Sequence, residues 1–146
     1  MQSETQKILG GCDDVAFRPS PMAISAQCNR VPTIDGHMEC VSLELRDRLA
    51  TVDDLRTALA EFQGLPQRLG QHTAPARPIV VRDEPDRPQP RRDRDTGNGM
   101  SAVVGRLRPC PVLDFKYVVL SHNTIRGAAG CAILNAELLL AQGYIR

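Results

Sequence analysis

The residues best equipped for chemistry lie between Cys28 and His37, with Glu4 and Lys7 near the start of the chain. Arg30 carries a planar guanidinium, which can hold a carboxylate or a phosphate through two parallel hydrogen bonds. His37 carries an imidazole, the side chain that most readily accepts and releases a proton near neutral pH. Together these side chains predict a site that binds an anion and moves a proton.

The composition argues against two broad classes of function. The chain has 146 residues, 18 basic and 17 acidic side chains and a formal charge of +1, so it lacks the positive charge that nucleic-acid binding requires. Trp is absent and Phe and Tyr are few, so platforms for base stacking are scarce. No apolar run approaches the roughly 18 residues that span a bilayer. We expect one domain, without nucleic acid or membrane partners, in the cytoplasm.

The cysteines indicate reduced thiols. Their number is odd and no two of them have C-x-x-C spacing, which is typical of a reducing compartment. A zinc site built from Cys28, His37 and Cys40 is conceivable, but its spacing matches no known pattern, so we expect no metal. The five cysteines are Cys12, Cys28, Cys40, Cys110 and Cys131.

Local patterns predict the elements that must position the chemical residues. A helix ends near Leu9, because Gly10 and Gly11 follow it. Residues 22–28 are short and mostly apolar, which predicts a buried strand with Arg30 at its exit. Apolar and polar residues then alternate over 40–45, which predicts a second strand that His37 enters from a turn.

The remainder of the chain alternates between helix and strand signals. Thr51 can cap a helix that continues to Phe62. Strands are predicted over 79–81, 100–107 and 112–120. The final helix, over 124–142, is apolar on nearly every side, so we expect it to be buried against another domain or subunit.

Four blocks of sequence carry a family resemblance. These blocks occur in the same order as in the carboxy-terminal half of aspartate-semialdehyde dehydrogenases of the archaeal and fungal type, which the chain resembles. The resemblance covers nearly the whole chain. The blocks are Glu4 with Lys7, residues 25–37, residues 84–95 and residues 122–130.

The resemblance implies a fold and a partner domain. It implies an α+β domain, with a mixed, largely antiparallel sheet and helices on one face, of the semialdehyde dehydrogenase dimerisation-domain type. Residues 1–146 would form the substrate-binding and dimerisation domain, and the helix over 124–142 would pack on an amino-terminal nucleotide-binding domain. The open sheet face would join two subunits in a homodimer or homotetramer, and residues 82–99 would form an ordered arm near that contact. A solvated loop is the competing interpretation of this charged, proline-containing stretch.

The resemblance also implies a reaction and roles. Such enzymes interconvert L-4-aspartyl phosphate with L-aspartate 4-semialdehyde and phosphate, using NADP(H) and a cysteine thioester, in the biosynthesis of lysine, threonine and methionine. His37 would be the general acid and base, Arg30 would bind the substrate carboxylate, Glu4 its ammonium group and Lys7 the phosphate. Asn123 would contact the cofactor, although it could equally cap the last helix. Ordinary surface pairs and a structural histidine are the competing interpretations.

Two parts that the resemblance implies for such an enzyme do not occur in the 146 residues: a nucleotide-binding domain with its Gly-rich turn, and the nucleophilic cysteine. The Gly97-Asn98-Gly99-Met100-Ser101-Ala102 motif resembles a nucleotide-binding turn, but a charged loop precedes it and a strand follows it. Cys28 lies on a predicted strand, so we do not assign it as the nucleophile. We therefore expect a fragment or truncated product that is inactive alone. The alternatives are a non-catalytic dimerisation module and a related malonyl-CoA reductase.

Overall fold

The computed structural model describes residues 2–46 and 50–146, which form two compact units divided after Pro32. The first unit contains α1 (Gln2–Ile8) and a short antiparallel hairpin of β1 (Gly11–Cys12) and β2 (Phe17–Arg18). The helix ends before the Gly10-Gly11 pair, as predicted. Gly10 leaves no room for a side chain, since an added Cβ would lie 2.3 Å from the Arg18 carbonyl oxygen.

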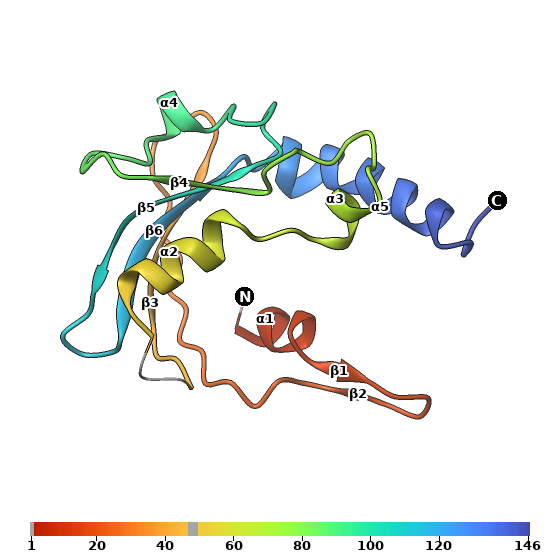
Figure 1. The fold of residues 1–146 in the computed structure, drawn as a ribbon, viewed down its shortest axis with the longest axis horizontal. Coiled ribbons are helices and arrows are strands. Elements are labelled where there is room, and N and C mark those ends of the chain that lie inside the picture. The colour runs from red at the N-terminus through yellow and green to blue at the C-terminus, as the bar shows by residue number, and fades with distance from the viewer. Residues whose placement is uncertain (1, 47–49) are drawn as a thin grey trace. The chain divides into compact units, whose positions relative to one another are not determined.

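The second unit, residues 33–146, contains a four-stranded mixed sheet in the order β3-β6-β5-β4 (Figure 1). The strands are β3 (His37–Leu43), β4 (Ile79–Arg82), β5 (Ala102–Pro109) and β6 (Phe115–Ser121). β6 is antiparallel to both of its neighbours, whereas β4 and β5 are parallel. The predicted α+β class with a mixed, largely antiparallel sheet is confirmed.

The register places four strand termini at one end of this sheet. His37 pairs with Ser121, and Val103 pairs with Leu120, so the start of β3, the end of β6 and the start of β5 lie together. Ile79, the first residue of β4, pairs with Ala102 at the same end. We call this edge the His37 end of the sheet.

The core is built on the two central strands. Val103 is fully buried and Leu120 is 1% exposed, and Val104 and Val118 are nearly as well covered. β3 is a strand at the sheet edge and is mostly exposed, with only Val41 and Leu43 among its alternating apolar residues half-buried. The alternation predicted over 40–45 is confirmed: Val41, Leu43 and Leu45 are half-buried, and the residues between them are exposed.

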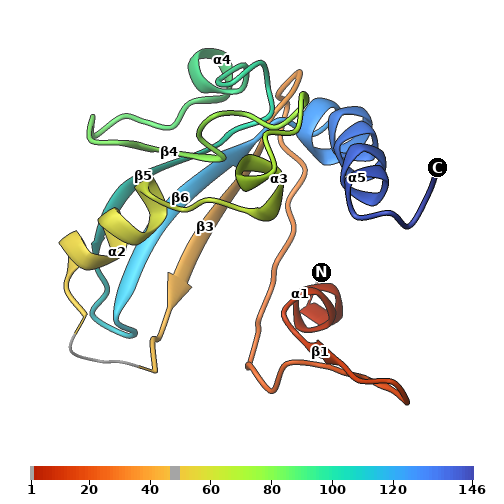
Figure 2. The same ribbon diagram turned by 45° about the vertical axis from the view of Figure 1, so that its right-hand side comes forward.

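Within the second unit, α2 (Val52–Ala60) and α3 (Leu65–Arg68) lie between β3 and β4 in the chain. α2 begins at the predicted cap: the Thr51 hydroxyl accepts a hydrogen bond from the Asp54 N–H, and the Asp54 carboxylate accepts one from the Thr51 N–H. This reciprocal pair satisfies two N–H groups at the helix start. α3 follows Gly64, with a proline in its first turn. α2 lies against β4 and β5, as both ribbon views show (Figure 2).

Residues 83–101 link β4 to β5 and include most of the predicted arm, residues 82–99, which is ordered by its own hydrogen bonds. Parallel neighbours require such a crossover, since the chain must return along the sheet before the next strand can start. The arm contains α4 (Pro90–Asp93) and a turn in which Gly97 and Gly99 adopt positive φ angles. It ends at β5 and not at a helix, so this turn is not a nucleotide-binding one.

The last helical segment begins differently from the prediction. Residues Ile125–Ala129 form a π-helical turn, η1, and α5 (Gly130–Ala141) continues from it. Its apolar surface is only partly covered within the chain: Leu134 is buried, whereas Ile133 is 56% exposed and Leu140 is 58% exposed. No helix in the described part of the chain is long and apolar enough to cross a membrane.

Candidate active site

His37 is the first residue of β3 and is exposed, at the position the sequence predicted for it. A bend at Ile34 and Asp35 leads into it, followed by buried Gly36. Gly36 has a φ angle of +113°, which side-chain-bearing L-residues rarely adopt. The chain therefore turns sharply and delivers the imidazole at the end of the sheet.

Gly36 is enclosed on three sides. A Cβ placed there would lie 3.0 Å from Leu120 Cδ1 and 3.2 Å from Pro90 Cβ. The side-chain oxygen of Asn123 accepts a hydrogen bond from the Gly36 N–H at 2.9 Å. The residue before His37 is thus fixed by β6, by the arm and by the segment that follows β6.

Asn123 and His37 are brought together by the sheet register. β6 ends at Ser121, the partner of His37, so Asn123 follows directly at the same end. The prediction that Asn123 could cap the last helix is wrong, because its oxygen accepts the Gly36 N–H, and Thr124, which makes no side-chain capping bond, is the residue at the cap position of η1. Among the described residues no second bond of the Asn123 amide occurs, so its NH₂ group is free to donate.

His122 is a structural participant that the sequence analysis missed. Its side chain is buried, and Nδ1 accepts hydrogen bonds from the N–H groups of Thr124 and Ile125 at 3.3 Å. These bonds make His122, and not Asn123, the residue that satisfies the start of η1. Nε2 lies 3.8 Å from the Asp95 carboxylate on the arm. The sequence offered one signal for this role: His122 lies in the fourth block of the resemblance, one residue before Asn123.

The arm carries a buried ion pair. Asp93 is fully buried, and its carboxylate accepts hydrogen bonds from the Arg87 guanidinium and from the Gln89 N–H. Burial raises the pKa of Asp93, but the bonds from Arg87 and Gln89 and the nearby Arg82 charge outweigh it, so the pKa is lowered overall. The carboxyl group is therefore ionised at neutral pH.

Glu4 and Lys7 lie in the first unit, on α1. They are three residues apart, so they share one face of the helix, and Lys7 is in its last turn. The helix is tied to the segment that follows the hairpin: Gln6 Nε2 donates to the Met22 carbonyl at 2.8 Å, and the Gln6 carbonyl accepts from the Ser20 N–H at 2.9 Å.

Arg30 also lies in the first unit, on extended chain, and is exposed. The buried strand predicted over 22–28 is wrong, because these residues form no strand in the described structure and most of them are exposed. A strand needs a hydrogen-bonding neighbour, and β1 and β2 pair with each other. Apolar composition by itself did not supply that neighbour.

Two cysteines of the larger unit lie on or beside the sheet, but not next to His37. Cys40 is three residues along β3, so its side chain points to the opposite face. Cys110 follows Pro109, which pairs with Phe115 at the far end of β6. Hydrogen bonds from the Leu113 and Val112 N–H groups lower the pKa of Cys110, yet its place in the register separates it from His37. Neither is assigned as the nucleophile.

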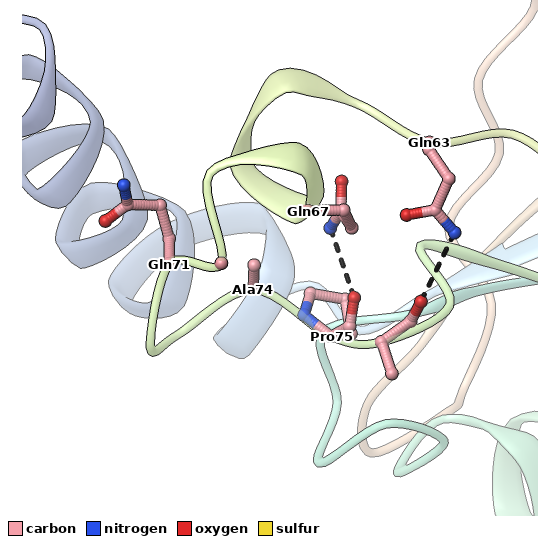
Figure 3. Close-up of a pocket in the computed structure, with 7 residues that line it drawn as sticks. Gln63, Gln67, Gln71, Ala74 and Pro75 are labelled. Atoms are coloured by element: carbon pink, nitrogen blue, oxygen red, sulfur yellow. Dashed lines mark hydrogen bonds between the residues drawn. The ribbon is translucent and has the colours of Figure 1, made fainter.

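A small pocket of about 230 Å³ lies elsewhere, between α3 and the loop that leads to β4 (Figure 3). Gln63 and Gln67 line it and donate to the carbonyls of Ala76 and Pro75, at 3.4 and 3.2 Å. No charged or titratable side chain lines it. The pocket therefore offers neither a positive charge for a phosphate nor a proton carrier, so we take the His37 end of the sheet, with its fixed turn, as the candidate active site.

The mixed sheet and the helices around it define the chain as an α+β protein. A family model described as the semialdehyde dehydrogenase dimerisation domain matches residues 1–126, and the chain belongs to this family. This finding confirms the resemblance drawn from the sequence.

Comparison with individual proteins shows which members of the family the chain is similar to. The chain is 52% identical over 151 residues to the aspartate-semialdehyde dehydrogenase of Candida albicans, and 50% identical over 141 residues to that of Methanothermobacter thermautotrophicus. These alignments cover 99% and 95% of the chain but 41% and 40% of the relatives. A crystal structure of the Candida albicans enzyme with NADP matches 99% of the chain and 42% of its own, with a TM-score of 0.89 and 53% identity. The chain thus spans about two fifths of these proteins.

Proposed function

We propose that this chain forms the substrate-binding and acid/base part of an aspartate-semialdehyde dehydrogenase that uses NADP(H). The observation that carries the proposal is the fixed turn at the His37 end of the sheet, where Asn123 holds Gly36 directly before His37. It occurs in a chain about half identical to proteins of that name.

The substrate is bound by residues of the first unit. Arg30 binds the α-carboxylate of aspartyl phosphate or aspartate semialdehyde, a task that suits its two-pronged guanidinium. Glu4 accepts the substrate ammonium group, and Lys7 binds the phosphate. The shared helical face of Glu4 and Lys7 supports their acting on one small ligand.

The proton is moved by His37. A cysteine outside the assigned residues attacks the acyl phosphate, a thioester forms and phosphate leaves; His37 accepts the thiol proton in this step. NADPH supplies the hydride that reduces the thioester to the aldehyde. His37 then returns the proton to the departing thiolate. The released phosphate takes up one proton from solvent, which is the net proton that the reduction consumes. The free NH₂ group of Asn123 fits the cofactor role, since it can donate to a carboxamide oxygen beside His37.

We propose that residues 124–142 contact an amino-terminal nucleotide-binding domain and that the protein is a homodimer or homotetramer. The exposed apolar residues of α5, Ile133 and Leu140 among them, support such a contact, because an uncovered apolar helix face favours burial. The dimerisation-domain description of the matching family supports the assembly. Residues 1–146 alone are expected to be inactive.

The test is an assay of the protein at its full natural length, here called the intact protein. It should reduce NADP⁺ when supplied with aspartate semialdehyde and phosphate. His37→Gln should lower kcat by roughly 10²- to 10⁴-fold, the usual contribution of a general acid or base. His72→Gln, which changes an exposed histidine, is the matched control and should leave kcat unchanged.

A second substitution addresses the carboxylate site. Arg30→Lys keeps the charge but removes the two-pronged geometry, so the KM for aspartate semialdehyde should rise more than the KM for phosphate. Turnover with malonyl-CoA in place of the phosphorylated substrate would instead indicate the related reductase. A stable dimer without either activity would indicate a non-catalytic dimerisation module and contradict the proposal.

A further inference from the structure

The Asp93 carboxylate determines the shape of the arm between Arg87 and α4. Arg87 Nε donates to Asp93 Oδ2 at 2.6 Å, and Arg87 Nη2 donates to Oδ1. The Gln89 N–H donates to Oδ2 at 2.7 Å, while the Asp93 N–H donates back to the Gln89 carbonyl at 2.8 Å. Side chain and main chain are thus closed into one compact turn around a fully buried carboxylate.

The contribution of this ion pair is geometric. Two charges removed from water regain in mutual attraction little more than they lose in hydration, so a buried pair is weak evidence for net stability. Its orientation is nevertheless strict, since a guanidinium fork and a carboxylate meet in one plane. The pair therefore fixes the shape of residues 87–93.

Two glycines, Gly105 and Gly36, lie where the turn of residues 87–93 packs closely against its neighbours. A Cβ at Gly105 of β5 would lie 2.4 Å from the Arg87 carbonyl oxygen and 3.0 Å from Pro88 Cδ. A Cβ at Gly36 would lie 3.2 Å from Pro90 Cβ and 3.6 Å from Pro90 Cα. The same short turn thus presses on the middle of the sheet through Arg87 and on the residue before His37 through Pro90.

The crossover topology explains why the arm reaches this place. β4 ends at Arg82, opposite Gly105, and β5 starts at Ala102 at the His37 end. The connecting arm must travel from one level of the sheet to the other, and α4 lies on that path. The approach of Pro90 to Gly36 is thus a consequence of the parallel pairing of β4 and β5. The shape of the turn that carries Pro90 is set by the bonds to Asp93.

We propose that Asp93 is a positioning residue for His37, acting through Pro90 and Gly36. The carboxylate holds α4 so that Pro90 supports one side of Gly36, while Asn123 holds its N–H on the other. The imidazole then emerges in a fixed direction. This inference rests on the proposed function only because that function gives His37 a catalytic task. The coupling of Asp93 to Gly36 through Pro90 does not depend on it.

The first test measures that coupling without any assay of activity. In the intact protein, the amide hydrogen exchange of Gly36 is compared with that of Val104 in the core, which corrects for global stability. Asp93→Asn should speed exchange at Gly36 by at least about tenfold relative to Val104, the equivalent of about 1.4 kcal/mol of lost local protection. Asp86→Asn, an exposed carboxylate on the same arm, is the control and should leave the ratio unchanged.

Pro90→Gly keeps Arg87 and Asp93 and removes the Pro90 Cβ that faces Gly36, so it carries the same test if Asp93→Asn does not fold. Unchanged Gly36 exchange in the folded variants would overturn the inference. The second test is kinetic: Asp93→Asn should lower kcat by about tenfold to a hundredfold, because small misplacements of a catalytic group cost that much, with little change in KM.

In a His37→Gln background the same Asp93 substitution should lower kcat by no more than about twofold, since the residue to be positioned is already gone. Full multiplication of the two losses would overturn the inference. If the unaltered protein has no dehydrogenase activity while Gly36 exchange still responds to Asp93, the proposed function fails and the coupling is supported.

Discussion

The side-chain oxygen of Asn123 accepts the Gly36 N–H at 2.9 Å, across 87 residues of sequence. This bond joins the segment after β6 to the turn before β3, the two places at which the sheet register puts Ser121 beside His37. The Asn123 oxygen thus holds the Gly36 backbone, while the NH₂ group is the part of the side chain for which we propose contact with the cofactor.

The two functions of Asn123 can be separated by substitution. Asn123→Asp retains an oxygen acceptor for Gly36 but loses the NH₂ donor, so the folded protein should keep its thermal stability and its KM for NADP⁺ should rise. Asn123→Ala removes both and leaves a part-buried N–H without a partner, which costs about 1 to 3 kcal/mol of unfolding free energy. Thermal unfolding and initial rates measure the two effects. Equal loss of stability in both variants would contradict this division.

Gly36 should tolerate no side chain. Gly36→Ala places a Cβ about 3 Å from Leu120 and Pro90 at a φ angle of +113°. Strain of this kind costs on the order of 1 to 3 kcal/mol, and kcat should fall with it because His37 follows directly. Gly70→Ala is a matched control, since Gly70 also has a positive φ angle but open space around it. A comparable fall in kcat for Gly70→Ala would show that backbone strain alone, and not the His37 turn, is responsible.

The capping box of α2 should affect stability and not catalysis. Thr51→Ala removes the acceptor for the Asp54 N–H, which costs about 1 kcal/mol of unfolding free energy. Bonds from the Thr51 hydroxyl and N–H lower the pKa of Asp54. Its stabilisation is therefore complete above the ordinary carboxyl pKa and is lost as the pH falls through the lowered value. Denaturant titrations of wild type, Thr51→Ala and the mid-helix control Thr57→Ala, at neutral and acidic pH, check both points.

Glu137 should make the loop before β4 sensitive to acid. Its carboxylate accepts the Thr73 hydroxyl at 2.6 Å and the Thr73 N–H at 3.0 Å, and these bonds lower the pKa of Glu137. The stabilisation is present above the ordinary glutamate pKa and disappears as the pH falls through the lowered one. Glu137→Gln should thus be less stable than wild type at neutral pH and equally stable at strongly acidic pH.

Hydrogen exchange of the Thr73 amide, with Glu61→Gln as an exposed control, measures this effect locally. Glu61 is the residue that caps the end of α2. A stability difference between Glu137→Gln and wild type that persists unchanged into acid would contradict the assignment of the effect to the ionised carboxylate.

Local signals predicted those elements whose stabilising partners are near in sequence. Thr51 and Asp54 are three residues apart, and Gly10 follows its helix, so both helix boundaries could be predicted. The segment 22–28 shows the opposite case: apolar composition predicted a buried strand, but pairing depends on a distant neighbour that composition does not specify.

The candidate site divides in the same way. His37 could be placed at a strand entrance because Asp35-Gly36 precede it, and that placement is confirmed. The contact of Pro90 with Gly36 and the bond from Gly36 to Asn123 could not be predicted, because each joins segments more than fifty residues apart. His122 was missed for a related reason. The sequence does not distinguish a buried histidine that accepts hydrogen bonds from backbone N–H groups from a catalytic histidine.

The parallel pairing of β4 and β5 has a practical consequence for protein engineering. Residues 83–101, rich in charge and proline, look like a stretch that could be trimmed to make a smaller or more crystallisable protein. Yet two strands that run in the same direction can be joined only by a chain long enough to retrace their length. Shortening it would force a different strand order, so this stretch should be treated as a fixed-length spacer in any redesign.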